Sequence, residues 1–162
     1  MVNLDDLYRE ILLDHYRNPR NRRALESANA SADGSNPLCG DEITLELQLD
    51  GDGRIADVAF SGDGCSISQA SSSLMTEYVK GRSSDEATSA IDAFQAMMVE
   101  GEEAPEDLGD IGALAGVRKF PMRVKCASLA WKTLELALAQ RDRDGDAPRA
   151  TVTTDERSTL NG

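Results

Sequence analysis

Residues 36–41 read Asn36-Pro37-Leu38-Cys39-Gly40-Asp41, and this short turn places a thiol and a carboxylate two positions apart. Pro37 fixes one backbone angle and Gly40 has no Cβ, so the segment can fold back and bring both side chains toward one point. Two further cysteines follow, Cys65 and Cys126, and each lies where a helix is expected to begin. Three thiols and one carboxylate make four donors, the number that a closed tetrahedral zinc site requires.

Length and charge indicate one acidic domain. A chain of 162 residues buries about two thirds of the surface that it exposes when unfolded, so a metal is not needed merely for folding. The 29 Asp and Glu residues outnumber the 17 Lys and Arg residues, which gives a formal net charge of −12. Nucleic acids and anionic membranes are therefore not expected as partners.

The N-terminal sequence is acidic and leads directly into an amphipathic pattern, without a basic segment followed by an apolar run. We therefore expect no signal peptide and no transmembrane span. Three cysteines are an odd number and lack the spacing of a disulfide framework, which favours reduced thiols in a cytoplasmic protein.

The first third of the chain predicts a helix and then a connector. Apolar residues recur at three- and four-residue steps over residues 4–17, and Asn18-Pro19 ends this helical pattern. His15 lies on the apolar stripe, and we expect it to be packed and hydrogen-bonded rather than catalytic. Residues 20–35 are small and polar, which is typical of a mobile connector.

A hairpin and a helix follow the cysteine turn. Alternating apolar residues over 43–49 and 55–60 predict two antiparallel strands, with an irregularity at Ala56-Asp57. After a glycine-rich turn, Ser66 and Gln69 have the spacing of a capping box that opens a helix. Cys65 would then precede the N-cap, where the helix dipole favours a thiolate. The small residues of this helix, which should end near Lys80, indicate close packing against another element.

The second half predicts three more helices. Apolar periodicity indicates helices over 84–99 and 111–117, separated by an acidic loop at 100–110 that is solvated or, as the alternative, binds a partner. Pro121 is suited to open the last helix, which should end near Arg141.

Cys126 falls in the first turns of this last helix, where the neighbouring cations Arg123 and Lys125 favour a thiolate. Residues 142–162 are polar and lack aromatic side chains, so we expect a disordered tail after a folded domain of residues 1–141.

Separated cysteines alone are a weak metal signal, because free cysteine is a common core residue. Inert core cysteines therefore remain an alternative to a metal site. Against that alternative, Cys39 and Cys65 lie in glycine-bearing loops that flank one hairpin, so the sheet can bring them together. Asp41 offers a harder oxygen donor than the thiolates, and we expect it to affect ligand exchange on zinc more than folding.

Five segments of the chain closely resemble the iron–sulfur cluster assembly scaffold family of IscU-type and NifU-type proteins. They are, in order, Leu7-Tyr8-Arg9, Asp14-His15-Tyr16-Arg17-Asn18-Pro19-Arg20-Asn21, Asn36-Pro37-Leu38-Cys39-Gly40-Asp41, Gly62-Asp63-Gly64-Cys65-Ser66-Ile67-Ser68 and Val124-Lys125-Cys126-Ala127-Ser128-Leu129-Ala130-Trp131. The resemblance covers residues from about 4 to 140. The SufU branch is the more similar, because Lys125 stands where IscU-type proteins have a histidine before the third cysteine, and because the stretch between Cys65 and Cys126 is longer than in IscU-type chains.

The resemblance implies an α+β fold in which a small antiparallel three-stranded sheet packs against an N-terminal helix and several C-terminal helices. It also implies that Cys39, Asp41, Cys65 and Cys126 bind zinc. Cys39 would accept persulfide sulfur from a SufS-type cysteine desulfurase, once a histidine of that enzyme replaces its thiolate on zinc. The sulfur would then pass to a downstream iron–sulfur assembly complex, which makes the chain a sulfurtransferase.

Two other functions stay open for the same residues. An iron–sulfur scaffold would assemble a cluster on the cysteines, and Lys125 in place of histidine argues against it. A structural zinc protein would keep all four ligands bound to zinc and transfer no sulfur, and the carboxylate of Asp41 argues against that function.

Overall fold

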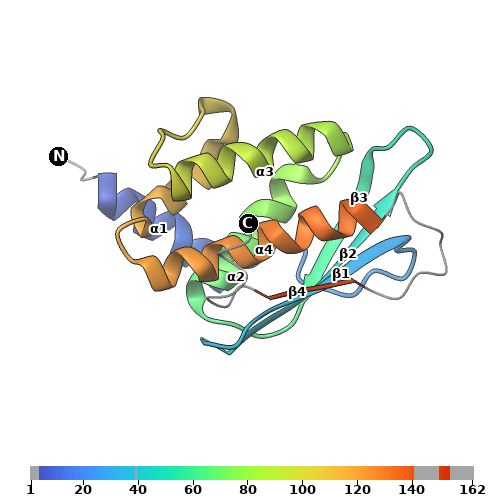
Figure 1. Cartoon of the computed structure of the whole chain (residues 1–162), viewed down its shortest axis with the longest axis horizontal. Helices are drawn as coiled ribbons and strands as arrows, with labels where there is room; N and C mark the ends of the chain where they lie inside the picture. The colour runs from blue at the N-terminus through green and yellow to red at the C-terminus, as the bar shows by residue number, and fades with distance from the viewer. Residues whose placement is uncertain (1–3, 39, 141–149, 154–162) are drawn as a thin grey trace.

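The structure, a computed structural model, describes residues 4–38, 40–140 and 150–153 of the chain. A sheet lies on one side of the molecule, and helices cover one of its faces (Figure 1). The elements follow in the order α1 (Leu4–Arg17), β1 (Ala30–Asn36), β2 (Asp41–Leu49), β3 (Ile55–Ser61), α2 (Ser66–Val79), α3 (Ser84–Val99), the 3-10 helix η1 (Glu106–Val117), α4 (Pro121–Gln140) and β4 (Ala150–Thr153).

The sheet contains the expected antiparallel strands. Its strand order is β3-β2-β1-β4, and β2 pairs antiparallel with both β1 and β3. The predicted irregularity is confirmed, because Gln48 pairs with Asp57 and Leu49 pairs with Ile55, which leaves Ala56 outside the register. The α+β class with three antiparallel strands is therefore confirmed.

The prediction of a connector over residues 20–35 is wrong for its second half, where the chain forms β1. The seven residues Ala-Ser-Ala-Asp-Gly-Ser-Asn have little intrinsic preference for a strand. Alternate positions are nevertheless buried, including Ala32, because β1 pairs with β2 on one side and lies under α4. Small side chains permit that close approach, so tertiary packing stabilises a strand that local sequence does not predict.

A fourth strand lies in the segment expected to be a tail. Residues 150–153 form β4, which pairs parallel with β1 and contacts α4. The sequence analysis did not predict this strand. The rest of the expected tail, residues 142–149 and 154–162, lies outside the described residues.

The predicted helices are present, with one correction. The expected solvated loop at 100–110 is wrong for its last five residues, which belong to η1, a 3-10 helix interrupted at Gly109 with φ of 58°. His15 is buried as expected, and its Nδ1 lies 2.8 Å from Ser73 Oγ on α2. None of the described helices combines the length and apolar character needed to span a membrane.

Helix α2 packs closely against α4, as its small residues predicted. The hydroxyl of Ser71 donates to the carbonyl oxygen of Ala127 at 2.6 Å and accepts from Trp131 Nε1 at 3.1 Å. Trp131 also stacks on Phe94 of α3, with ring centroids 4.6 Å apart. These contacts fix the position of α4 relative to the start of α2, which carries the second cysteine.

The close approach of β1 and α4 yields a first prediction. A Cβ added at Gly34 would overlap the hydroxyl of Thr133 and press on Leu129 and Ile43. Gly34→Ala should therefore lower the free energy of unfolding by about 1–3 kcal/mol. Gly51→Ala in the hairpin loop is the matched control, because an added Cβ there meets no atom within 4 Å. Chemical denaturation of both variants measures the difference, and equal stability would show that β1 does not lie so close to α4.

Candidate metal centre

The first component of the site is Asp41, the first residue of β2. It continues the buried face of that strand and is itself fully buried. Its Cα partner across the ladder is Asn36, the last residue of β1, so only four residues join the two strands. Gly40 has φ of 71°, a left-handed conformation that favours glycine. Cys39, the predicted sulfur acceptor, belongs to this turn in sequence but lies outside the described residues.

The second component is Cys65, and the structure corrects its predicted place. Cys65 is itself the N-cap of α2, and its Sγ accepts the backbone N–H of Ser68 at 3.4 Å. The predicted capping box of Ser66 and Gln69 is therefore wrong, because the sulfur performs the role that a hydroxyl or carboxylate oxygen usually has at an N-cap. The Cys65 thiol thus lies at the positive end of the helix dipole.

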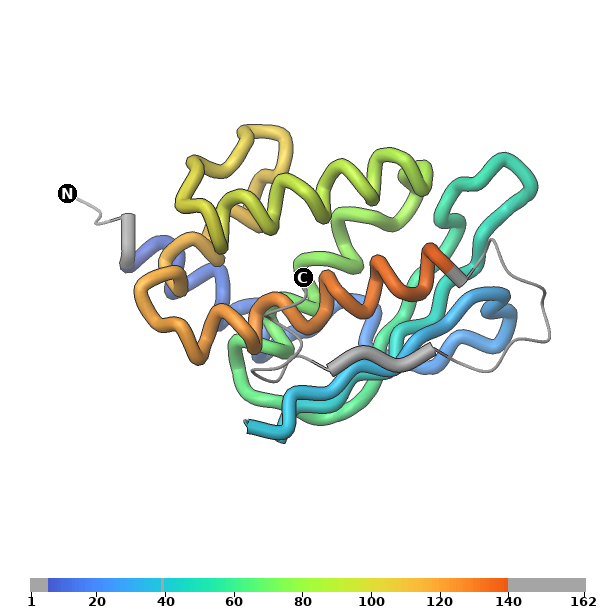
Figure 2. The backbone as a smooth tube through the Cα atoms, viewed as in Figure 1, coloured from blue at the N-terminus to red at the C-terminus, as the bar shows by residue number. Residues whose placement is uncertain are grey.

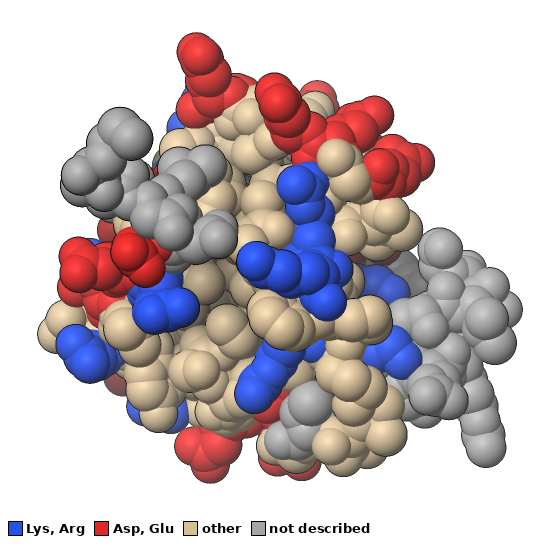
Figure 3. Space-filling view, turned by 90° about the vertical axis from the view of Figure 1, so that its left-hand side faces the viewer, with Lys and Arg blue, Asp and Glu red and all other residues tan. Residues whose placement is uncertain are grey.

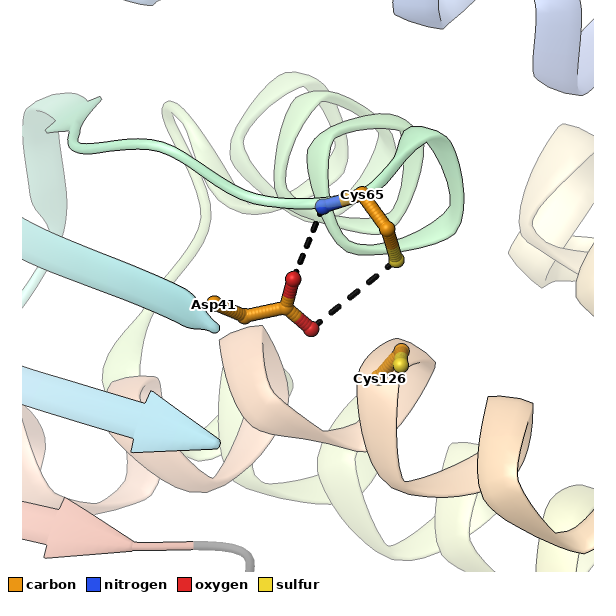
Figure 4. A group of neighbouring side chains, drawn as sticks. All are labelled: Asp41, Cys65 and Cys126. Atoms are coloured by element: carbon orange, nitrogen blue, oxygen red, sulfur yellow. Dashed lines mark hydrogen bonds between the residues drawn. The ribbon is translucent and has the colours of Figure 1, made fainter. Parts of the chain in front are cut away.

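Asp41 and Cys65 contact each other through the carboxylate of Asp41 (Figure 4). One carboxylate oxygen of Asp41, Oδ1, accepts the backbone N–H of Cys65 at 2.7 Å, and the other, Oδ2, lies 3.8 Å from Cys65 Sγ. Gly64 permits this approach, since a Cβ there would come within 3.0 Å of Asp41 Oδ1. From the sequence, Asp41 was expected to act in transfer more than in folding, whereas this hydrogen bond gives the carboxylate a part in the fold.

The third component is Cys126, which projects from the second turn of α4. It is fully buried, and its Sγ lies 3.5 Å from the carbonyl oxygen of Met122 in the preceding turn. One ligand atom each from Asp41, Cys65 and Cys126 lies within 4.8 Å of the others. Figure 2 shows how the β1–β2 turn, the start of α2 and the first turns of α4 approach one another at one end of the sheet.

These three side chains fit a zinc ion. Zinc binds thiolate sulfur at about 2.3 Å and carboxylate oxygen at about 2.0–2.2 Å, so tetrahedral ligand atoms lie roughly 3.5–3.8 Å apart. The 3.8 Å between Asp41 Oδ2 and Cys65 Sγ already agrees with this spacing. Two thiols and a carboxylate are also donors that zinc accepts together.

The environment of Cys65 favours its ionised form. A hydrogen bond from the Cys126 thiol and backbone N–H groups at the start of α2 lower the pKa of Cys65 to about 6. Burial and the neighbouring negative charge of Asp41 raise the pKa, but they do not outweigh these bonds. The Cys65 thiol therefore ionises more readily than an ordinary cysteine, and the thiolate is the form that binds metals.

Sequence reasoning missed Arg22, which supports the site from the segment between α1 and β1. Its Nη2 donates to the carbonyl oxygen of Gly62 at 2.9 Å, and its Nε donates to Gln69 Oε1 at 3.2 Å. These two bonds join the loop before Cys65 to the first turns of α2. No local pattern predicts them, because the partners lie 40 and 47 positions away along the chain.

Comparison with known proteins agrees with this geometry. The model of the NifU-like N-terminal domain family matches residues 7–139. The chain belongs to this family. The zinc-dependent sulfurtransferase SufU of Bacillus subtilis is 49% identical to this NifU-like chain, over 87% of the chain and 95% of that protein. The iron–sulfur cluster assembly scaffold protein IscU of Streptococcus pyogenes is 44% identical, over 85% of the chain and 86% of that protein.

A solved structure has the same fold. It is the crystal structure of a putative iron–sulfur cluster assembly scaffold protein for the SUF system from Fervidobacterium islandicum. The TM-score is 0.74 and the sequence identity is 42%, over 80% of this chain and 94% of that one. The resemblance inferred from the sequence is therefore confirmed, and this NifU-like domain accounts for most of the described residues.

The bond between Asp41 and Cys65 yields a second prediction. Asp41→Ala should lower the stability of the metal-free protein by about 1.5–3 kcal/mol, because it removes a charged acceptor from the partly buried N–H group of Cys65. Asp41→Asn keeps an acceptor oxygen and should retain most of that stability while binding metal more weakly. Glu42→Ala, which changes the adjacent exposed carboxylate, is the control and should change stability by less than about 0.5 kcal/mol. Denaturation of the three metal-free variants would contradict this role if Asp41→Ala and Glu42→Ala were equally stable.

Proposed function

We propose that this NifU-like protein is a zinc-dependent sulfurtransferase, which accepts persulfide sulfur from a cysteine desulfurase and passes it on for iron–sulfur cluster assembly. The observation that carries the proposal is the cluster of one buried carboxylate and two thiols, with ligand atoms within 4.8 Å of one another. This cluster lies beside the short turn whose sequence contains a third thiol. The combination agrees with the zinc-dependent sulfurtransferase activity for which the SufU relative is named.

Four residues would hold the zinc ion in this proposal: Cys39, Asp41, Cys65 and Cys126. When bound, zinc keeps its sulfur ligands ionised at neutral pH and protected from other reactions. Cys65 is held as the N-cap of α2, and Cys126 is buried in α4. By contrast, both sequence neighbours of Cys39 are exposed: Gly40 adopts a left-handed conformation, and Leu38 is 51% exposed. The exposure of these two neighbours favours Cys39 as the thiol that reacts with a partner protein.

Sulfur transfer to Cys39 needs no external oxidant or reductant. The Cys39 thiolate attacks the terminal sulfur of the persulfide on the desulfurase cysteine, and a new sulfur–sulfur bond forms to Cys39. The bond between that terminal sulfur and the desulfurase cysteine breaks, and the desulfurase cysteine leaves as a thiolate. The proton of the persulfide stays on the transferred sulfur. A downstream iron–sulfur assembly complex then takes this sulfur from Cys39.

The surface around the site is suited to a protein partner. Leu38 in the β1–β2 turn and Phe120 and Met122 at the start of α4 are each more than half exposed. Figure 3 shows that Lys and Arg side chains gather near the centre of the face at this end of the molecule, although the chain is acidic overall. Exposed apolar side chains next to cations favour contact with a partner that offers apolar and acidic groups. The desulfurase would bind this surface.

The metal content of the purified protein is the third prediction and separates the candidate functions. We expect about one zinc ion per chain and little iron, because thiolates with a carboxylate suit zinc. An iron–sulfur scaffold remains the second candidate, since the Streptococcus relative is named as one. Stoichiometric iron with sulfide, measured by elemental analysis, would favour the scaffold instead. Zinc that stays bound without any transfer of sulfur would favour a purely structural site.

The fourth prediction tests Cys39 directly. After incubation with a cysteine desulfurase and cysteine, the peptide that carries Cys39 should gain the mass of one sulfur atom, and the desulfurase should turn over faster. Cys39→Ala should abolish both effects, because no thiolate remains to attack the persulfide. The variant should still associate with the desulfurase, since the exposed residues around the turn are unchanged.

Mass spectrometry of digested protein and a sulfide-release assay measure these effects, and size-exclusion chromatography measures association. Leu38→Ala is a useful control at the neighbouring position, because it keeps the thiol and should weaken association while still allowing sulfur transfer at high desulfurase concentration. Extra sulfur found only on Cys65 or Cys126 would refute the acceptor role of Cys39.

A further inference from the structure

We propose that Asn36 is a positioning residue, which holds Cys126 as a permanent metal ligand by donating a side-chain N–H to its sulfur. This inference rests on the proposed function, because it assigns a role toward the same metal. It concerns a residue outside the four predicted ligands.

Asn36 lies where the three parts of the site meet. It is the last residue of β1, its Cα partner across the ladder is Asp41, and it is fully buried. Its Nδ2 lies 3.7 Å from Sγ of Cys126, which is ninety positions further along the chain. Asn36 thus connects the end of β1 that pairs with Asp41 to the helix that carries the buried Cys126 thiol.

The hydrogen bonding of the Asn36 amide adds little to the stability of the fold. Among the described residues, no donor lies within hydrogen-bond distance of its buried Oδ1 atom. A buried polar atom without a partner costs free energy, and an apolar side chain of similar shape would avoid that cost. The contact with Cys126 is the polar contact that the structure gives to this side chain. The hydrogen bond from Asn36 to Cys126 is therefore expected to affect metal binding more than the stability of the metal-free fold.

The direction of this hydrogen bond depends on the ionisation of Cys126. As a thiol, Cys126 can donate its single hydrogen either to the Cys65 sulfur or to the carbonyl oxygen of Met122 at 3.5 Å. As a thiolate it has only lone pairs, so it must accept, and the amino end of Asn36 supplies a donor. A hydrogen bond to a charged sulfur is stronger than one to a neutral thiol. Asn36 is therefore placed to donate to the Cys126 sulfur when that sulfur binds a metal.

This bond also separates the roles of two cysteines. A donated N–H withdraws negative charge from the sulfur, which makes Cys126 a weaker nucleophile while leaving it able to bind metal. It also orients Sγ toward the other ligand atoms, as interactions outside the ligand set commonly do at metal sites. Cys126 is thereby kept as a ligand, and the sulfur-accepting role is left to Cys39.

The test uses two variants that remove the donor, Asn36→Leu with a similar shape and Asn36→Ala with a smaller one. Three quantities are measured: zinc affinity by competition with a chelator, the sulfur-to-metal charge-transfer absorption of the cobalt-substituted protein, and the thermal stability of the metal-free protein. Asn29→Leu is the control, because the Asn29 amide bonds the backbone of Leu49 at the opposite end of β2, at 2.7 and 2.8 Å.

Both Asn36 variants should bind zinc about 10- to 100-fold more weakly than the original protein. Their cobalt absorption should shift to lower energy, because the Cys126 sulfur becomes richer in electrons. Asn36→Leu should be at least as stable as the original protein without metal, since it removes an unpartnered buried oxygen. Asn29→Leu should show the reverse pattern, with lower metal-free stability and unchanged zinc affinity and absorption.

Several results would overturn the inference. Unchanged zinc affinity and cobalt absorption in both Asn36 variants would show that the N–H does not act on the metal site. Metal-free Asn36→Leu as unstable as Asn29→Leu would make Asn36 a structural residue. If the original protein bound neither zinc nor cobalt, the proposed function would fail together with this inference. If it bound both as expected and the Asn36 variants did so equally, the inference alone would fail.

Discussion

The hydrogen bond from the backbone N–H of Cys65 to the Asp41 carboxylate is the contact on which the site depends. It joins the first residue of β2, which is fully buried, to the partly buried N-cap of α2 at 2.7 Å. A buried carboxylate needs such a donor, because charge without a partner is costly in a protein interior. The same bond directs the second oxygen of Asp41 toward the Cys65 sulfur. The sheet and the helix thus present two metal-binding atoms through one interaction.

The position of Cys126 depends on the packing of α4 rather than on any single bond. Helix α4 lies across β1 and β2, and the Trp131 and Ser71 contacts hold it against α2. Interiors are packed at the density of organic crystals, so a helix held in this way has little freedom to shift. The depth at which Gly34 lies beneath α4 therefore affects where the third ligand atom points.

Local patterns predicted those parts of the fold that local sequence determines. Apolar periodicity located the helices and the hairpin, and the cysteine spacing indicated residues that prove to be neighbours. The strand β1 was missed, because its small residues form a strand only through pairing with β2 and packing under α4. The N-cap role of Cys65 was missed because capping rules are based on oxygen side chains. The role of Asn36 was not predicted from local sequence, since its hydrogen-bond partner Cys126 lies ninety residues away along the chain.

The electrostatics of the site explain why a divalent cation suits it. Asp41 is a negative charge beside Cys65, and by itself it raises the pKa of that thiol. The fold offsets this repulsion with the backbone N–H groups of α2 and the neighbouring Cys126 thiol, so the pKa falls to about 6. Ionising further groups in the same buried volume would place like charges together, which costs free energy unless a cation or a proton compensates. Metal binding at such a site is therefore linked to proton release, and its affinity rises with pH until the remaining ligand thiols are ionised.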